Sequence, residues 1–149
     1  MILLAYRHGL RVGELVHLRW DQVDLQTGLL HVRRLKKGLP STHPLTGAEI
    51  RVLRQIHRVA DDAPYVFLSE RGGPMTVNNA QKMIQKVGEV AKVGFVVHFH
   101  MCRHGAGYKL ANDGQDTRAI QLYLGHKSIN HTARYCELSP ERFRDFWQD

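Results

Sequence analysis

The sequence has little cysteine, no long apolar run and no recognisable export signal. Its only two cysteines, Cys102 and Cys136, exclude the disulfide framework of a small secreted protein and favour a reducing compartment. No apolar run approaches the roughly 20 residues that a membrane-spanning helix needs. The opening MILLAYRHG lacks the basic lead-in and the small-residue cleavage site of a signal peptide. These absences predict a cytoplasmic protein that does not enter a membrane.

Acidic residues are also in short supply. Fourteen Asp and Glu face 21 Lys and Arg, which gives a net charge of +7 and a pI near 9.7. A basic balance favours a polyanionic partner, above all nucleic acid. The length of 149 residues and the 43% hydrophobic content fit one globular domain over residues 1–149. Because the first residues read as the middle of a helix, we expect the natural protein to begin upstream of Met1.

The first half of the chain predicts short helices around a β-hairpin. Gly9 is suited to end the first helix in the left-handed conformation, and Lys36-Lys37-Gly38 reads as the turn of the hairpin. The expected elements are a helix over 2–8, a short helix opening at Glu14, strands over 28–35, 41–45 and 65–68, and a helix with a capping box from Thr46 to Glu49.

The second half reads as almost entirely helical. The first expected helix runs from Thr76 to Gly94, with an apolar stripe made of Val77, Ala80, Ile84, Val87 and Ala91. The next bears His100 and is closed by Gly114, and a third is capped by Asp116 and directs Ala119, Ile120, Leu122 and Tyr123 inward. A fourth helix is capped by Ser128, and a last one begins at Ser139 and carries Phe143, Phe146 and Trp147. The predicted fold class is therefore a mostly helical α+β domain with about three antiparallel strands on one edge.

The stretch from His100 to Tyr135 carries side chains suited to phosphate chemistry. His100 and Arg103 lie one helical turn apart, His126 follows in a Leu-Gly-His corner, and Tyr135 lies on a short helix. A guanidinium binds phosphate oxygens through paired hydrogen bonds, and a phenol can act as a covalent nucleophile. A free phenol titrates near about 10, so it needs a base or a strong positive potential at neutral pH.

Arg11 is a further candidate, just ahead of the short helix in LRVGEL. It reads either as a surface charge or as a phosphate ligand at a helix start. Lys36 and Lys37 also have two interpretations. Each is either a solvated surface residue of the hairpin or a proton donor that reaches a neighbouring groove.

These residues occur in an order typical of one family. LRVGEL, LKKG, HMCRH, LGH and Tyr135 follow one another over roughly residues 2–147, with 23 residues from Arg103 to His126 and nine more to Tyr135. The chain closely resembles the catalytic domain of tyrosine recombinases, the phage integrase family. Within that family, LAYRHG, RRLKKG, HPL and INHTARY are similar to the short fimbrial-switch DNA invertases.

The resemblance implies which residues bind the phosphate. Arg11 and Arg103 would clamp the non-bridging oxygens of the scissile phosphate and stabilise the charge of the pentavalent transition state. His126 would donate a hydrogen bond to the same group.

The resemblance also implies which residues carry out the reaction. Tyr135 would attack phosphorus and form a 3′-phosphotyrosyl link, and His100 would assist the transfer of its proton. Lys36 would protonate the departing 5′-oxygen, although Lys37 remains an alternative. His104 is expected to support its helix rather than touch the substrate.

The predicted function is therefore site-specific DNA strand exchange, as inversion or integration. The expected partners are double-stranded DNA, other copies of the chain in a tetramer on DNA, and accessory DNA-bending proteins in the nucleoid. No cofactor or metal is expected, because two arginines and a lysine can replace a metal ion.

Two other functions compete with this interpretation. His98, His100, Cys102 and His104 are dense enough to suggest zinc, although Cys102 would point away from the other side chains on a helix. A non-catalytic DNA-binding regulator could also keep the fold. The remaining histidines (His8, His17, His31, His43, His57, His131) are expected to be solvated or satisfied in the core, and Tyr6, Tyr65, Tyr108 and Tyr123 are expected to pack.

Overall fold

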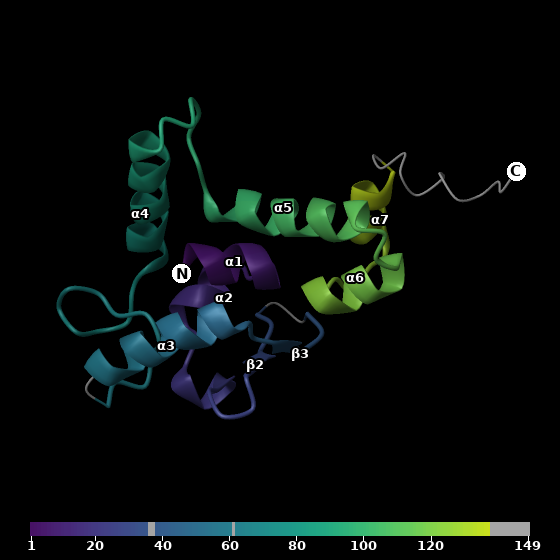
Figure 1. The fold of residues 1–149 in the computed structure, drawn as a ribbon. Coiled ribbons are helices and arrows are strands. Elements are labelled where there is room, and N and C mark those ends of the chain that lie inside the picture. The colour runs from purple at the N-terminus through teal and green to yellow at the C-terminus, as the bar shows by residue number, and fades with distance from the viewer. Residues whose placement is uncertain (36–37, 61, 138–149) are drawn as a thin grey trace, which may run out of the picture.

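The computed structural model describes residues 1–35, 38–60 and 62–137, which form seven α-helices and one small sheet (Figure 1). The elements are, in order, α1 (Ile2–His8), α2 (Val12–Val16), the 3-10 turn η1 (Trp20–Gln22), β1 (Val23–Asp24), β2 (Leu29–Val32), β3 (Ser41–Pro44), α3 (Gly47–Val59), α4 (Val77–Val90), α5 (Phe99–Asn112), α6 (Thr117–Leu124) and α7 (Asn130–Cys136). Within the described ranges, no helix combines the length and the apolar character needed to span a bilayer. The predicted helix from Ser139 lies outside the described residues.

The sheet is antiparallel with the order β1-β2-β3, as the predicted hairpin requires. The third strand is Val23–Asp24, so the prediction of a strand over 65–68 is wrong. In that segment Tyr65 and Leu68 each form only an isolated bridge. Its Val66 and Phe67 are buried in the main core, so burial rather than sheet pairing explains the apolar run.

The predicted helix ends are confirmed at most positions. Gly9 ends α1 with a φ of 57°, and the Thr46, Thr76 and Asp116 side chains each accept a hydrogen bond from the backbone N–H three residues on. The end of α4 was predicted too late. The helix stops at Val90 because Lys92, with a φ of 52°, already turns the chain into the left-handed region.

Two of the predicted apolar stripes are displaced. On α4 the buried residues are Ala80, Ile84 and Gly88, while Val87 is exposed. On α6 the prediction that Leu122 faces inward is wrong, since 46% of it is exposed. Ala119 of α6 and Val77 of α4, which were also expected on the buried faces, are exposed. The tertiary contacts of each helix cover a different face from the one that the sequence pattern indicates.

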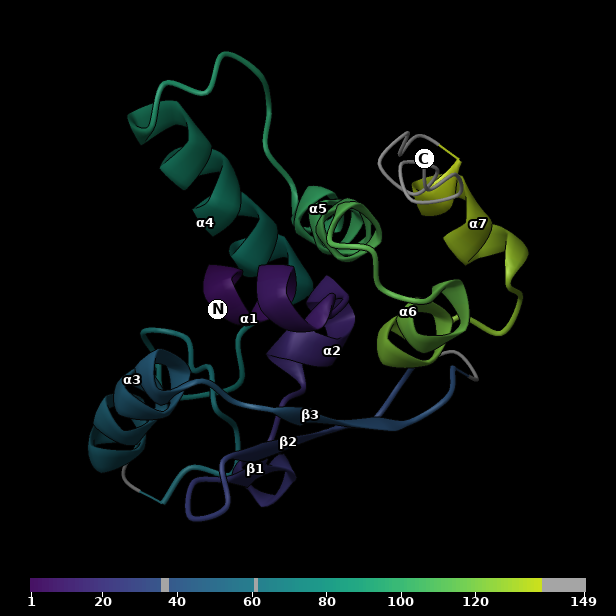
Figure 2. The same ribbon diagram turned by 45° about the vertical axis from the view of Figure 1, so that its right-hand side comes forward.

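Helix α5 links the two halves of the molecule. It packs along α1 and then contacts α6 and α7 at its far end (Figure 1). The β2–β3 hairpin runs from the side of α3 to a position beneath α6, where β3 contacts that helix (Figure 2). The C-terminal ends of α1 and α6, the hairpin and α7 therefore meet along one face of α5.

A buried polar network joins α1, β3 and α3. The His8 side chain lies 3.1 Å from a Glu49 carboxylate oxygen through Nε2 and 3.2 Å from His43 Nδ1 through Nδ1. His43 Nε2 is 2.8 Å from the Ser41 hydroxyl, and its ring stacks on that of Tyr123 at 3.8 Å. Burial lowers the pKa of His43 to about 3, so this imidazole is neutral. The expectation that His8 and His43 are satisfied in the core is confirmed.

We expect the free energy of unfolding to decrease as the pH falls below neutral. The pKa of His43 is about 3 in the folded protein and 6.5 when unperturbed, so only the unfolded chain takes up this proton near about pH 5. By linkage His43 alone costs about 2 kcal/mol of stability at that pH. Thermal unfolding of His43→Gln should show a shallower dependence on pH. The exposed His17→Gln is the matched control, and an unchanged slope in His43→Gln would contradict the assignment.

Candidate active site

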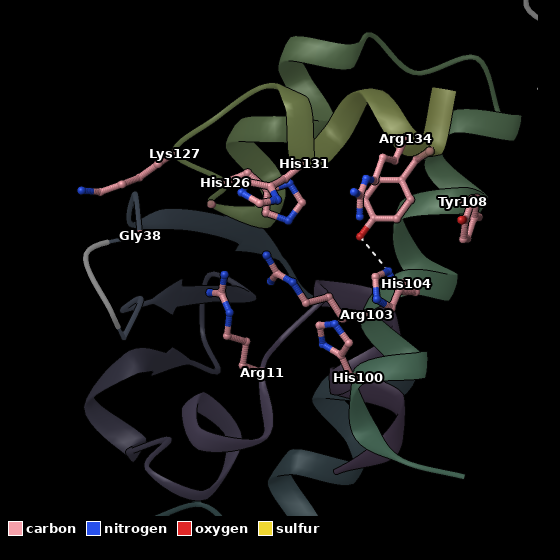
Figure 3. Close-up of a pocket in the computed structure, with 12 residues that line it drawn as sticks. Arg11, Gly38, His100, Arg103, His104, Tyr108, His126, Lys127, His131 and Arg134 are labelled. Atoms are coloured by element: carbon pink, nitrogen blue, oxygen red, sulfur yellow. Dashed lines mark hydrogen bonds between the residues drawn. The ribbon is translucent and has the colours of Figure 1, made fainter. Parts of the chain in front are cut away.

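A cavity of about 500 Å³ lies where these elements meet (Figure 3). It is lined by Arg11, His100, Arg103, His126 and Tyr135, all of them predicted site residues. Lys36 and Lys37 lie outside the described residues, but the next residue of the hairpin, Gly38, also lines the cavity.

Arg103 is held by the ends of two helices. Its side chain is buried on α5, and its guanidinium donates hydrogen bonds to the carbonyl oxygen of Gly9 and, at 2.7 Å, to that of Leu124. These carbonyls belong to the C-terminal ends of α1 and α6, which are left unpaired by the helices themselves and attract a cation. Burial and the nearby Arg11 lower the pKa of Arg103 to about 10, which still leaves it cationic at neutral pH.

Arg11 precedes α2 and is held by a carboxylate one turn later. Its Nη1 donates to Glu14 Oε1 at 3.0 Å, and its backbone N–H donates to Glu14 Oε2 at 2.9 Å. The Glu14 carboxylate is buried, whereas 35% of the Arg11 side chain is exposed to the cavity. Figure 3 shows the guanidinium groups of Arg11 and Arg103 directed into the same space. Two cations that face one cavity form a site for an anion such as phosphate.

His126 directly follows Gly125, which closes α6 with a φ of 67°. Its Nδ1 lies 2.8 Å from the buried hydroxyl of Thr132, and Gln121 donates to its carbonyl at 3.0 Å. Burial, followed by repulsion from Arg103, lowers the pKa of His126 to about 4, so the ring is neutral. If the Thr132 hydroxyl donates to Nδ1, the remaining Nε2–H is a hydrogen-bond donor.

The Tyr135 phenol is buried within the same cavity. Its ring lies directly over Gly107 of α5, where a Cβ would come within 2.5 Å of a ring carbon, and beside the Tyr108 ring at a centroid distance of 5.0 Å. Burial raises the pKa of Tyr135 more than the positive charge of Arg103 lowers it. The phenol is therefore protonated at neutral pH and needs a base to react.

The side chain that contacts this phenol is His104. Its Nδ1 lies 3.1 Å from the Tyr135 hydroxyl, a contact that is drawn as the dashed line in Figure 3. His100 lies one turn earlier on α5, with its ring edge-on to that of His104 at 4.2 Å. Burial lowers the pKa of both histidines, which leaves each imidazole neutral and able to accept a proton. From the sequence we expected His104 to support its helix rather than to reach the site. Its four-residue spacing from His100, which places both rings on one face of α5, was the signal for the observed position.

Other cationic and aromatic residues of the cavity were not predicted. These residues are Tyr108, Lys127, His131 and Arg134. The His131 ring lies 5.9 Å from that of His126, while Lys127 extends away from the centre (Figure 3). For Lys127, His131 and Arg134, closeness to His126 and Tyr135 in the sequence was the available signal, whereas Tyr108 lies one helical turn after His104 on α5.

The histidines of α5 do not assemble into a zinc site with Cys102. Cys102 packs against the main hydrophobic core, and it does not line the cavity. Across residues 1–35, 38–60 and 62–137, no three His, Cys, Asp or Glu side chains are grouped so that they could hold a metal ion.

Comparison with known proteins supports the resemblance seen in the sequence. The phage integrase family matches residues 1–142 of this chain. The chain belongs to the phage integrase family. It is a tyrosine recombinase by family, and the predicted similarity to fimbrial-switch proteins is confirmed by 40% identity to the type 1 fimbriae regulatory protein FimE of Escherichia coli K12, over 99% of this chain and 78% of that protein. FimB of the same strain is 38% identical over 99% of this chain and 76% of its own length.

The fold agrees with solved structures of the family. The crystal structure of XerA recombinase is 28% identical, with a TM-score of 0.81 over 96% of this chain and 54% of that one. XerH recombinase bound to its difH substrate has the same TM-score at 20% identity, over 97% of this chain and 43% of that one. This chain therefore spans about half the length of these solved proteins, and the predicted fold class is confirmed.

We expect Gly107→Ala to expose the Tyr135 phenol while α5 remains helical. Alanine favours a helix, but its Cβ would lie 2.5 Å from the ring and displace it. Nitration by tetranitromethane, mapped by mass spectrometry, should modify Tyr135 several-fold faster in the variant. Gly47→Ala, where a Cβ meets nothing within 4 Å, is the control. Equal nitration of Tyr135 in both variants would show that α5 shifts to accept the methyl group.

Proposed function

We propose that this chain cleaves and rejoins double-stranded DNA at specific sites, through a covalent link between Tyr135 and a 3′-phosphate. The observation that carries the proposal is the Tyr135 phenol, which lies in one cavity with two arginines and a neutral imidazole 3.1 Å from its oxygen. The net charge of +7 suits the DNA backbone, and affinity should therefore fall steeply with salt.

The cavity supports binding of the scissile phosphate as the first step. Arg11 and Arg103 place their charges on its non-bridging oxygens, and the Nε2–H of His126 donates a further hydrogen bond. Because all three groups are held before the substrate arrives, they stabilise the added negative charge of the pentavalent transition state. Loss of one such donor typically costs on the order of 10²–10³ in rate.

Bond exchange at phosphorus follows. The Tyr135 oxygen bonds to phosphorus as its proton passes to Nδ1 of His104, and the bond from phosphorus to the 5′-oxygen breaks. We assign the proton to His104 rather than to His100, because a nitrogen of His104 lies within hydrogen-bond distance of the phenol. The 5′-oxygen takes a proton from the hairpin lysine, with Lys36 preferred and Lys37 the alternative.

Rejoining is the reverse of this sequence. The phosphotyrosyl bond keeps the energy of the broken phosphodiester, so a 5′-hydroxyl can attack it without ATP or another cofactor. Exchange between two duplexes needs four cleavages, which we assign to four copies of the chain on DNA. Residues 1–149 then act as one catalytic domain in the cytoplasm, at the nucleoid, together with accessory DNA-bending proteins.

We expect incubation with nicked suicide DNA to give a protein–DNA adduct that survives denaturant. The adduct should be absent in Tyr135→Phe, which removes the nucleophilic oxygen and keeps the ring over Gly107. Gel electrophoresis after denaturation measures the adduct, and Tyr65→Phe is the control. Specific DNA binding without any adduct in the unsubstituted protein would instead favour a DNA-binding regulator that keeps the recombinase fold.

We expect His104→Gln to reduce single-turnover cleavage by about 10²-fold, in the range of general-base effects. Glutamine can still hydrogen-bond the phenol but cannot take its proton, so the rate of the variant should rise with pH as more of the phenol ionises. His100→Gln should have a smaller effect. A larger loss in His100→Gln would return the proton-accepting role to His100.

A further inference from the structure

The Arg34 side chain lies beneath the cavity without lining it. It follows β2 by two residues, and 0% of its side chain is exposed. The neighbouring Arg33 is a surface residue, with 63% of its side chain exposed and an ion pair to Asp21 at 3.3 Å. Two adjacent arginines of the hairpin therefore have opposite environments, and burial of a guanidinium is costly unless its partners are well placed.

One partner of Arg34 is the carboxylate that holds Arg11. Arg34 Nη1 donates to Glu14 Oε2 at 2.9 Å, while Arg11 Nη1 donates to Glu14 Oε1 at 3.0 Å. The buried Glu14 carboxylate thus bridges the two guanidinium groups. Only Arg11 faces the cavity, so Arg34 fixes the orientation of the carboxylate from behind.

The other partner is the C-terminal end of α6. Arg34 Nη2 donates to the carbonyl of Tyr123 at 2.6 Å, and the next carbonyl, that of Leu124, accepts from Arg103. The chain then turns through Gly125 into His126. One guanidinium therefore connects the residue that orients Arg11 with the corner that carries His126.

Two glycines make room for this side chain. A Cβ on Gly125 would lie 2.7 Å from Arg34 Nε, and a Cβ on Gly38 would lie 2.8 Å from Arg34 Cβ. The hairpin and the α6 corner approach each other across Arg34 at a distance that larger residues would not allow. Lysine could keep the charge there, but it lacks the planar fork that reaches both partners.

We infer that Arg34 is a positioning residue for the phosphate clamp, which holds Arg11 through Glu14 and fixes the end of α6 that carries His126. This inference rests on the proposed function, because it needs a phosphate between Arg11 and Arg103. Arg34 itself does not touch the substrate. Its loss should therefore weaken the stabilisation of charge on the non-bridging oxygens and leave the nucleophile in place.

The test compares two suicide DNA substrates in single-turnover cleavage. One has an ordinary scissile phosphodiester, and the other has a methylphosphonate, in which a methyl group replaces a non-bridging oxygen and removes the charge. We expect Arg34→Gln and Arg34→Lys to cleave the phosphodiester about 10- to 100-fold more slowly, as misplacement of a catalytic group does. Their loss on the methylphosphonate should be less than about threefold, because a neutral phosphorus centre depends less on the clamp.

Arg11→Ala serves as the reference for a damaged clamp, and Arg33→Gln is the matched control, which should cleave both substrates like the unsubstituted protein. Equal losses on both substrates in the Arg34 variants, beside a selective loss in Arg11→Ala, would show a merely structural role and overturn the inference. If Arg34→Gln does not fold, Arg34→Lys decides by the same comparison. Failure of the unsubstituted protein to cleave either substrate would instead refute the proposed function.

Discussion

The site depends on the contact between one buried guanidinium and two helix ends. Arg103 can occupy the interior only because the carbonyls of Gly9 and Leu124 replace the water that it loses. The same hydrogen bonds join α1, α5 and α6, so the charge of the cavity and the packing around it are established together. Removal of the Arg103 side chain would therefore disturb folding as well as chemistry, and Arg11 is the better probe of the clamp.

Burial and the nearby arginines together keep the imidazoles of the cavity neutral. Burial is the main cause that lowers the pKa values of His100, His104 and His126, and repulsion from Arg103 adds to it. The cavity therefore separates two tasks between two kinds of side chain. Arg103 remains cationic at neutral pH, whereas the neutral imidazoles can donate hydrogen bonds or accept a proton. Tyr135, whose pKa is raised by burial, needs such an acceptor.

Much of the local structure could be predicted, because caps and turns depend on residues close in the sequence. The capping box at Thr46 and the left-handed glycine at Gly9 are of this kind. Most failures concern contacts between segments far apart in the sequence. Whether residues 65–68 pair as a strand, or which face of α6 is covered, depends on neighbours that are distant in the sequence, and a short apolar run has the same composition in either case.

The sequence by itself determined the family, the order of the described helices and the types of side chain in the site, because these follow from motifs and their spacing. Only the tertiary structure decided which of two similar residues makes which contact. His104 rather than His100 meets the phenol, and Arg34 rather than Arg33 is buried against Glu14. In each pair the residue types are the same. The difference arises from how α5 and the hairpin are rotated against α6 and α7, which is set by packing between segments far apart in the chain.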